Sequence, residues 1–278
     1  MPSAEINGIV AAYEDRGTGP ALVLVHGHPF DRTMWRPQLD RFAATHRVIA
    51  PDLRGYGATT VVPGLTPLSA YADDLAALLD HLGVGEFVLG GLSMGGQIVM
   101  ECYRRFPGRI RGLVLADTFP AAETEEGRAA RNATADRLLA EGMRGYADEV
   151  LDKMVAPYNT HAAPHVHRMM CATDPAGAAA ALRGRAERPD YRALLTTVSV
   201  PALVVVGRDD TYTPVAEAEA MHALLPDATL AVIEGAAHLP NLERPEEFDA
   251  ALDAFLSSLT RSAQVKVRNR TDAPTMGA

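Results

Sequence analysis

Cysteine is scarce in this chain, which carries only Cys102 and Cys171 among its 278 residues. The two lie far apart and lack C-x-x-C spacing, so neither a disulfide framework nor a zinc knuckle is expected. The beginning of the chain also lacks the basic and then apolar pattern of a secretory signal. Together these absences predict a cytoplasmic protein in a reducing compartment.

An excess of positive charge and long apolar runs are also missing. The chain has 35 acidic against 26 basic residues, a formal net charge of −9, which repels nucleic-acid phosphates and anionic lipid surfaces. No apolar stretch approaches the ~18 residues that a membrane-spanning helix needs. We therefore expect no nucleic-acid partner and no membrane partner. Hydrophobic residues make up 47% of the chain, which is enough for a sizeable core.

Short apolar runs recur along the chain, and each ends in a polar or glycine-containing loop. Residues 21–25 end at His26-Gly27, and residues 87–90 lead into Gly91. Helix-like stretches lie between the runs, most clearly at 71–82, where leucines recur at three- and four-residue spacing. Alternating strands and helices predict an α/β fold with a mostly parallel central sheet and helices on both faces. Further strands are expected at 47–50, 112–116, 203–206 and 230–233.

Residues 120–192 break this rhythm, because they are rich in Ala, Arg and Glu and are interrupted by prolines. We interpret them as a helical lid inserted into one core, which comprises residues 1–119 and 193–260. Residues 261–278 lose the hydrophobic periodicity and carry basic side chains, which predicts a disordered basic tail without an assigned function.

A candidate nucleophile lies in the segment Gly91-Leu92-Ser93-Met94-Gly95, which matches G-x-S-x-G. The motif follows a strand-like run and precedes a helix-like one, which is the context that it requires. Small residues on both sides of Ser93 allow a tight turn, and the following helix would place its positive end beside a developing oxyanion. A phosphate-binding turn is the alternative, but neither a P-loop lysine nor G-x-G-x-x-G spacing is present.

A serine hydroxyl needs a base to take its proton and a third group to hold that base. Of the nine histidines, only His238 follows a strand-like run downstream of an acidic loop. That loop contains Asp209 and Asp210, which the local pattern does not separate, and either could be a solvated turn carboxylate. Asp117 is a further candidate acid that ranks lower, because its loop opens directly into the predicted lid.

The loop His26-Gly27-His28-Pro29-Phe30 follows the first clear strand and can supply a second backbone amide to an oxyanion. We predict the amides of His28 and Met94 as the two donors, since Pro29 has no N–H. We expect the His26 side chain to be buried and to brace the loop.

A possible metal cluster of His161, His165, His167 and Cys171 is a weaker candidate. Pro164 interrupts the helix that would align the first two histidines, and no acidic partner is evident nearby in the sequence. We interpret these residues as a solvated face of the lid. The sequence thus predicts no metal and no cofactor.

These segments resemble the α/β-hydrolase superfamily over roughly residues 5–260, and within it the branch of 3-oxoadipate enol-lactonases, aryl esterases and cofactor-free haloperoxidases (perhydrolases). The resemblance implies an acid loop of the form G-x-x-D-x-x-x-P, which selects Asp210 over Asp209. It therefore implies a catalytic triad of Ser93, Asp210 and His238. Related dehalogenases have an aspartate where this chain has Ser93, so dehalogenation is disfavoured. The other residues that carry the likeness are 26–31, 51–57 and 235–243.

The resemblance implies a serine hydrolase that cleaves a carboxylic ester or lactone of a small molecule through an acyl-enzyme. Two alternatives stay open at this point. One is perhydrolysis, in which peroxide replaces water, and the other is a non-hydrolytic small-molecule binding protein on the same fold. A homo-oligomer is compatible with the sequence.

Overall fold

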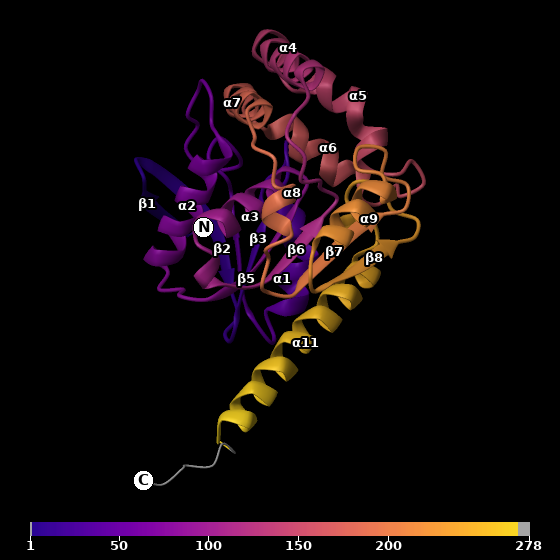
Figure 1. Cartoon of the computed structure of the whole chain (residues 1–278). Coiled ribbons are helices and arrows are strands. Elements are labelled where there is room, and N and C mark those ends of the chain that lie inside the picture. The colour runs from indigo at the N-terminus through magenta and orange to yellow at the C-terminus, as the bar shows by residue number, and fades with distance from the viewer. Residues whose placement is uncertain (1, 272–278) are drawn as a thin grey trace.

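The structure is a computed structural model that describes residues 2–271, with side chains described up to residue 261. One sheet forms its centre (Figure 1). Its strands are β1 (Ser3–Ile6), β2 (Ile9–Arg16), β3 (Ala21–Val25), β4 (Arg47–Pro51), β5 (Phe87–Leu92), β6 (Ile110–Ala116), β7 (Ala202–Gly207) and β8 (Ala228–Ile233). They are arranged in the order β1-β2-β4-β3-β5-β6-β7-β8. The pairs β1/β2 and β2/β4 are antiparallel and the other neighbours are parallel, which confirms the predicted sheet.

The central strands contribute side chains to two separate hydrophobic cores. Val23 and Val25 of β3 belong to one core, whereas Leu22 and Leu24 belong to the other. Successive side chains of a strand point to opposite faces, so a strand that is covered on both faces is apolar at every position. This explains why β5 and β7 are buried throughout and why their sequences do not alternate.

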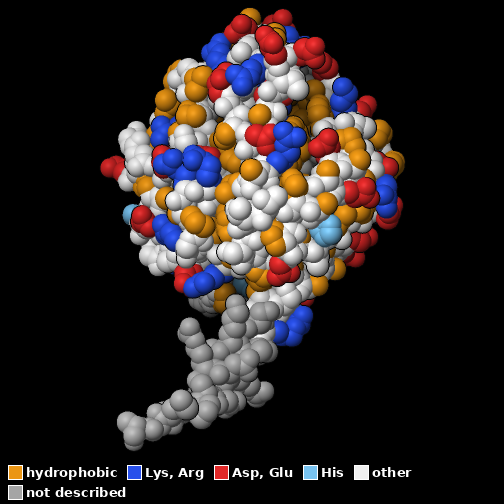
Figure 2. Space-filling view, in the orientation of Figure 1, with side chains coloured by type: hydrophobic (Ala, Val, Ile, Leu, Met, Phe, Trp, Pro, Cys, Tyr) orange, Lys and Arg blue, Asp and Glu red, His pale blue; other side chains and the backbone are white. Residues whose placement is uncertain are grey.

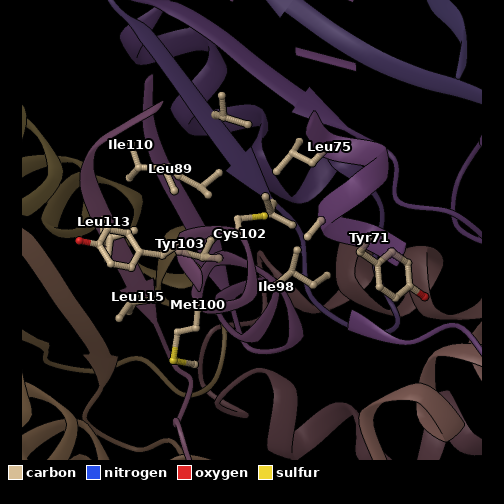
Figure 3. Close-up of a cluster of buried hydrophobic side chains, with 14 of the residues drawn as sticks. Tyr71, Leu75, Leu89, Ile98, Met100, Cys102, Tyr103, Ile110, Leu113 and Leu115 are labelled. Carbon is tan, nitrogen blue, oxygen red and sulfur yellow. The ribbon is translucent and has the colours of Figure 1, made fainter. Parts of the chain in front are cut away.

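The first core lies under helices α2 (Leu68–His81), α3 (Met94–Arg105), α8 (Arg192–Leu195) and α9 (Val215–Leu224). Figure 3 shows Leu75 of α2, Ile98 of α3 and Leu89 of β5 in the same buried cluster. The second core lies under η1 (Arg32–Trp35), α1 (Arg36–Phe42), α10 (Pro240–Glu243) and α11 (Pro245–Thr271), where Trp35 packs against Phe248. Both faces of the sheet are therefore covered, as predicted for an α/β fold. The short η2 (Pro107–Arg109) leads into β6.

Four further helices lie between β6 and β7, in the stretch for which the sequence predicts a lid. They are α4 (Glu125–Glu141), α5 (Arg144–Met154), α6 (Ala163–Ala172) and α7 (Pro175–Ala186), and together we call them the insertion. They group at one edge of the molecule, with α4 and α5 outermost in Figure 1. Leu138 of α4 packs against Leu182 of α7 in a small separate core. The chain leaves and re-enters the main body at one point, where the Tyr191 amide donates to the Pro120 carbonyl at 2.8 Å.

The backbone remains helical beyond residue 260, because α11 continues to Thr271. The predicted disordered tail, residues 261–278, therefore begins within a helix in this structure. Residues 272–278 of that tail lie outside the described residues. None of the described helices combines the length and apolar character needed to cross a membrane. On the face shown in Figure 2, acidic and basic side chains are interspersed.

Candidate active site

Ser93 occupies the turn between the end of β5 at Leu92 and the start of α3 at Met94. Its φ of 56° and ψ of −115° place it in a backbone region that residues other than glycine rarely adopt. The turn is tight, because a Cβ on Gly95 would lie 2.2 Å from the carbonyl oxygen of Val25. The G-x-S-x-G segment thus forms a strand-to-helix elbow, with the serine at its apex.

Two hydrogen bonds, one to the last residue of β6 and one from a residue just after it, hold Ser93 in this conformation. The Ser93 amide donates to the carbonyl of Ala116 at 2.9 Å, and the Thr118 hydroxyl donates to the carbonyl of Ser93 at 2.8 Å. The surrounding structure therefore offsets the cost of the unusual backbone angles.

His238 and Asp210 form a buried pair at the ends of β8 and β7. His238 Nδ1 lies 2.8 Å from Asp210 Oδ2, and the Tyr212 amide donates to Asp210 Oδ1 at 2.7 Å. The Thr213 hydroxyl also donates to this carboxylate. Burial alone would raise the pKa of Asp210, but the charge of His238 and these hydrogen bonds lower it to about 2. An ionised Asp210 makes Nδ1 the protonated nitrogen of the imidazole and leaves Nε2 available as a base.

The loop that carries His238 is held by the buried carboxylate of Glu243. Its Oε1 accepts hydrogen bonds from the amides of Ala237 at 2.9 Å and Leu239 at 3.1 Å, on either side of the histidine. Its Oε2 accepts from the Asn159 side chain, which follows α5, at 2.8 Å. Glu243 therefore couples the histidine loop to the insertion, a role that the sequence did not reveal.

The structure separates the two adjacent aspartates that the local sequence pattern left unresolved. Asp209 is exposed and accepts a hydrogen bond from the Tyr158 hydroxyl, whereas Asp210 bonds to His238. Adjacent side chains leave the backbone in different directions, so only one of the two can reach the imidazole. In this arrangement Asp210, and not Asp209, contacts the imidazole of His238.

Asp117, the other acidic candidate, lies at the end of β6 next to this pair. It has a φ of 43°, and its Oδ1 accepts a hydrogen bond from the Gly207 amide at 2.9 Å. Its Oδ2 has no hydrogen-bond partner within residues 2–261. Burial and then the charge of Asp210 raise the pKa of Asp117 well above its ordinary value. Asp117 is therefore the weaker acid of the two, and it does not hold the imidazole.

Possible metal ligands are few in the part of the chain that the structure describes. One group of three emerges there, in which ligand atoms of Asp117, Asp210 and His238 lie within 4.8 Å of one another. Asp210 and His238 already bond to each other in that group, and the raised pKa of Asp117 disfavours the anionic form that a cation needs.

The histidines singled out in the insertion do not converge on one point. His167 Nε2 lies 2.6 Å from Asp148 Oδ1, and His165 Nε2 lies 3.2 Å from the Thr33 hydroxyl. Cys171 Sγ contacts the His167 ring at 3.7 Å. These are separate surface and loop contacts rather than a shared ligand sphere.

Two backbone segments approach Ser93 from different sides. Met94 is the first residue of α3, and the first amides of a helix have no acceptor within the helix. The loop after β3 carries His28, whose Nδ1 lies 2.8 Å from the Tyr56 hydroxyl. His26 in the same loop is fully buried and accepts the Leu53 amide at Nε2 at 3.0 Å. This bond fixes the loop against the chain that follows β4.

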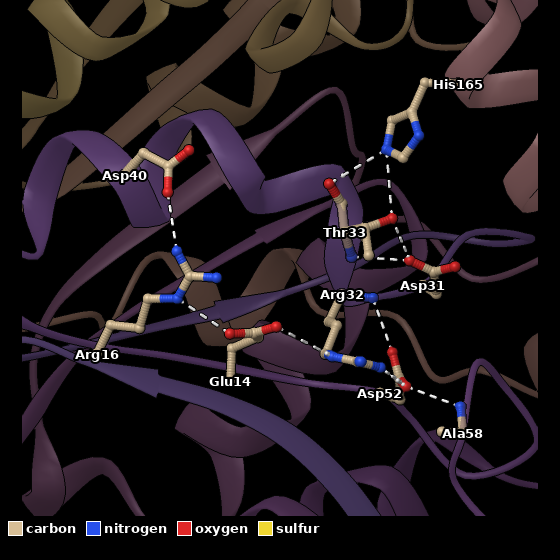
Figure 4. A network of polar contacts seen from close by, with 9 residues as sticks. All are labelled: Glu14, Arg16, Asp31, Arg32, Thr33, Asp40, Asp52, Ala58 and His165. Atoms are coloured by element: carbon tan, nitrogen blue, oxygen red, sulfur yellow. Dashed lines mark hydrogen bonds and ion pairs between the residues drawn. The ribbon is translucent and has the colours of Figure 1, made fainter. Parts of the chain in front are cut away.

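A polar network anchors the far end of that loop (Figure 4). The buried carboxylate of Asp52 accepts the Arg32 amide at 2.8 Å and the Ala58 amide at 2.8 Å, and it also pairs with the Arg32 guanidinium. Asp31 caps η1 by accepting the Thr33 amide at 2.7 Å. The network therefore fixes the start of η1, and with it the loop that carries His28.

Ser93, His28 and His238 line a common cavity of about 210 Å³. The insertion closes the cavity with Arg131 of α4, Tyr146 and Met154 of α5, and Leu182 and Arg185 of α7. The residues predicted from the sequence are thus brought together from β3, β5 and β8. The insertion residues were not predicted, because an arginine in an amphipathic or Ala-rich helix carries no pattern that distinguishes a cavity residue from a solvated one.

A family model described as "Alpha/beta hydrolase family" matches residues 22–251. The chain belongs to this family. This membership confirms the predicted α/β-hydrolase fold and the prediction of an α/β-hydrolase enzyme.

Among solved structures, the chain is similar to a thermophilic esterase from Thermogutta terrifontis in a malate-bound structure. The two share 40% identity at a TM-score of 0.89, over 92% of this chain and 97% of that one. A bromoperoxidase from Bacillus anthracis shares 25% identity at a TM-score of 0.81, over 92% of this chain and 99% of the other. 3-Oxoadipate enol-lactonase 2 of Acinetobacter baylyi is 29% identical over 85% of this chain and 88% of its own length. The resemblance to the branch of lactonases, esterases and haloperoxidases is thereby confirmed.

Proposed function

We propose that this protein is a serine hydrolase that cleaves a carboxylic ester or lactone of a small molecule with a triad of Ser93, Asp210 and His238. One observation carries the proposal. Ser93, on a strained elbow, lines the same cavity as His238, which is paired with an ionised Asp210. The similarity to an esterase and an enol-lactonase supports an ester or lactone as the substrate.

In the proposed reaction, Ser93 Oγ attacks the carbonyl carbon while His238 Nε2 takes its proton. The amides of His28 and Met94 stabilise the negative charge on the carbonyl oxygen. His238 then gives the proton to the leaving alkoxide, and an acyl-enzyme on Ser93 remains. A water molecule, deprotonated by the same imidazole, releases the acid and restores the serine. Asp210 holds the imidazole in the required tautomer, and the insertion acts as a lid that excludes bulk water.

The test uses a fluorophosphonate, which reacts with an activated serine and does not require a known substrate. We expect one adduct per chain by intact-mass analysis, with peptide mapping that assigns it to Ser93. Ser93→Ala should remove the adduct and abolish hydrolysis of aryl acetates. Asp210→Asn should lower kcat by about 10⁴-fold, because the imidazole then adopts the wrong tautomer.

Ser69→Ala is the matched control, because Ser69 lies on α2 and does not line the cavity. Its labelling and turnover should equal those of the unmodified protein. Hydrolysis that persists in a pure Ser93→Ala preparation would refute the proposal, and so would labelling of Ser93 that is undiminished in His238→Ala.

The similarity to a bromoperoxidase supports perhydrolysis as a second candidate. In that reaction, hydrogen peroxide instead of water attacks the acyl-enzyme and releases a peracid, which oxidises bromide. A bromination assay with acetate, peroxide and bromide separates the two. Ser93-dependent bromination that exceeds ester hydrolysis would favour perhydrolysis, whereas hydrolysis without bromination would exclude it.

A further inference from the structure

Arg185 of α7 is a buried cation that no carboxylate neutralises in the described part of the chain. The residue is only 7% exposed, and it lines the cavity with Ser93 and His238. The one hydrogen bond of its side chain to a described residue runs from Nε to the Gln97 side-chain oxygen at 3.1 Å. A neutral amide satisfies one donor of the guanidinium but does not compensate its charge.

The other charges around Arg185 do not supply the missing anion. Arg131 and Arg188 lie close enough to lower its pKa after burial, which is the largest cause. Both of these arginines pair with the same carboxylate, Glu123, whose pKa is lowered to about 2 against the opposing effect of burial. The group therefore has three cations and a single anion, so positive charge is left over in the cavity.

The pKa of His28, which also lines the cavity, responds to the same positive charges. Burial and then the charges of Arg185 and Arg131 lower the pKa of His28 well below its ordinary value. A neutral imidazole adds no compensating charge. Its Nε2 has no hydrogen-bond partner within residues 2–261. The positive charges of Arg185 and Arg131 would therefore stabilise an anion that enters the cavity.

Gln97 fixes where such an anion would be held. The backbone N–H of Gln97 donates to the Ser93 carbonyl at 3.2 Å, as in one turn of a helix. The two residues therefore lie about 6 Å apart along the axis of α3. Because Gln97 engages Nε of Arg185, the two terminal nitrogens of the guanidinium are left for a ligand. These nitrogens form the planar pair of donors that matches a carboxylate.

We propose that the cavity binds substrates in which a carboxylate accompanies the scissile ester or lactone, and that Arg185 grips that carboxylate. This proposal rests on the proposed hydrolase function and names its substrate class. The cavity of about 210 Å³ is smaller than a typical pocket for a drug-sized ligand, so the substrate is small. A half ester of a short dicarboxylic acid has the required size and charge.

The experiment compares two esters that differ only in charge at the far end of the acyl chain. Monomethyl glutarate ends in a carboxylate where methyl pentanoate ends in a methyl group. We expect kcat/KM to be about 10- to 100-fold higher for monomethyl glutarate, as is typical of one charged hydrogen-bonded pair. Arg185→Met should abolish this preference, so that the ratio of the two kcat/KM values falls to about 1.

Two further variants separate charge from folding. Arg185→Lys retains the charge but loses the planar donor pair, so it should keep only part of the preference. Arg128→Met is the matched control, because Arg128 lies on α4, pairs with Glu187 at the surface and does not line the cavity. It should leave the preference intact. Equal kcat/KM for the two esters in the unmodified protein would overturn the proposal, as would a preference that survives in Arg185→Met.

A binding measurement distinguishes failure of this proposal from failure of the hydrolase proposal. Glutarate should raise Tm of the unmodified protein above that in sodium chloride of equal ionic strength, and it should not raise Tm of Arg185→Met. If Ser93 does not react with the fluorophosphonate but glutarate still stabilises through Arg185, the hydrolase proposal falls and the carboxylate site stands. If Ser93 reacts and glutarate gives no shift, the carboxylate site falls and the hydrolase proposal stands.

Discussion

Asp117 and Asp210 lie at the ends of neighbouring strands, β6 and β7, and differ in how they hold their protons. Asp210 accepts hydrogen bonds and pairs with His238, which lowers its pKa to about 2 despite burial. Asp117 is buried beside that negative charge, which raises its pKa. Two carboxyl groups in contact with one site thus have pKa values that their surroundings push apart, which allows one to stay charged while the other is neutral.

The raised pKa of Asp117 predicts how its replacement changes stability with pH. A carboxyl whose folded-state pKa is raised contributes stability below its unfolded pKa of about 4, and that contribution is lost as the pH rises through the folded-state value. Asp117→Asn removes this loss and keeps an oxygen for the Gly207 amide. The stability of Asp117→Asn relative to the unmodified protein, measured as the difference in the free energy of unfolding, should therefore be greater at pH 8 than at pH 4.

Urea unfolding at the two pH values measures this difference. Asp227→Asn in the turn before β8 serves as the control, because Asp227 is exposed to solvent. A stability difference between Asp117→Asn and the unmodified protein that does not change with pH would contradict the raised pKa of Asp117.

At the scale of elements, the elbow between β5 and α3 fixes the site through close packing. α3 passes so near to the end of β3 that a glycine is needed at position 95. The same closeness brings the positive end of α3 to the loop that carries His28. Geometry at the nucleophile is therefore set by the distance between one helix and one strand.

Gly95→Ala should lower the free energy of unfolding by about 1–3 kcal/mol, because the new Cβ would lie 2.2 Å from the Val25 carbonyl oxygen and force the helix away. Labelling of Ser93 by the fluorophosphonate should fall with it. Gly108→Ala in η2 is the control, since no atom lies within 4 Å of its Cβ position, and it should stay within about 0.5 kcal/mol. Equal stability of the two variants would show that the helix can move without cost.

These elements also show what a sequence can and cannot predict. The nucleophile segment is contiguous, and its strand, turn and helix are each visible locally, so its fold followed from the residues. Asp209 and Asp210 are neighbours in the same loop, so the choice between them needed either a family pattern or the direction of a side chain. Arg185 acquires its role only from the pairing of Glu123 with two other arginines, and such a charge count exists only once α4 and α7 are packed together.

Across the whole molecule, the sign of the charge differs between the outside and the cavity. The chain has a formal net charge of −9, whereas the group around Arg185 has excess positive charge. An anionic substrate is therefore repelled at long range and attracted at short range. Salt screens exposed charges over distance more strongly than it screens buried pairs.

The contrast between the negative net charge of the chain and the positive charge in the cavity predicts how salt changes kcat/KM for an anionic substrate. When the ionic strength rises from about 0.01 M to 0.15 M, the Debye length falls from roughly 30 to 8 Å and the long-range repulsion weakens. We expect kcat/KM for monomethyl glutarate to rise by about twofold or more, while that for methyl pentanoate stays constant. A fall in kcat/KM for monomethyl glutarate would mean that attraction by exposed cations dominates the approach.

The hydrogen bond between Tyr191 and Pro120 closes the insertion into a loop whose two ends meet. A segment with adjacent ends can be exchanged for another of different length without displacing a strand, since loop closure depends only weakly on length. In this chain the chemistry and the choice of substrate therefore belong to separable parts. The sheet and its loops hold the reactive groups, and the helices of the insertion, whose chain ends meet at Pro120 and Tyr191, are the part that evolution or an engineer can replace to change what is bound.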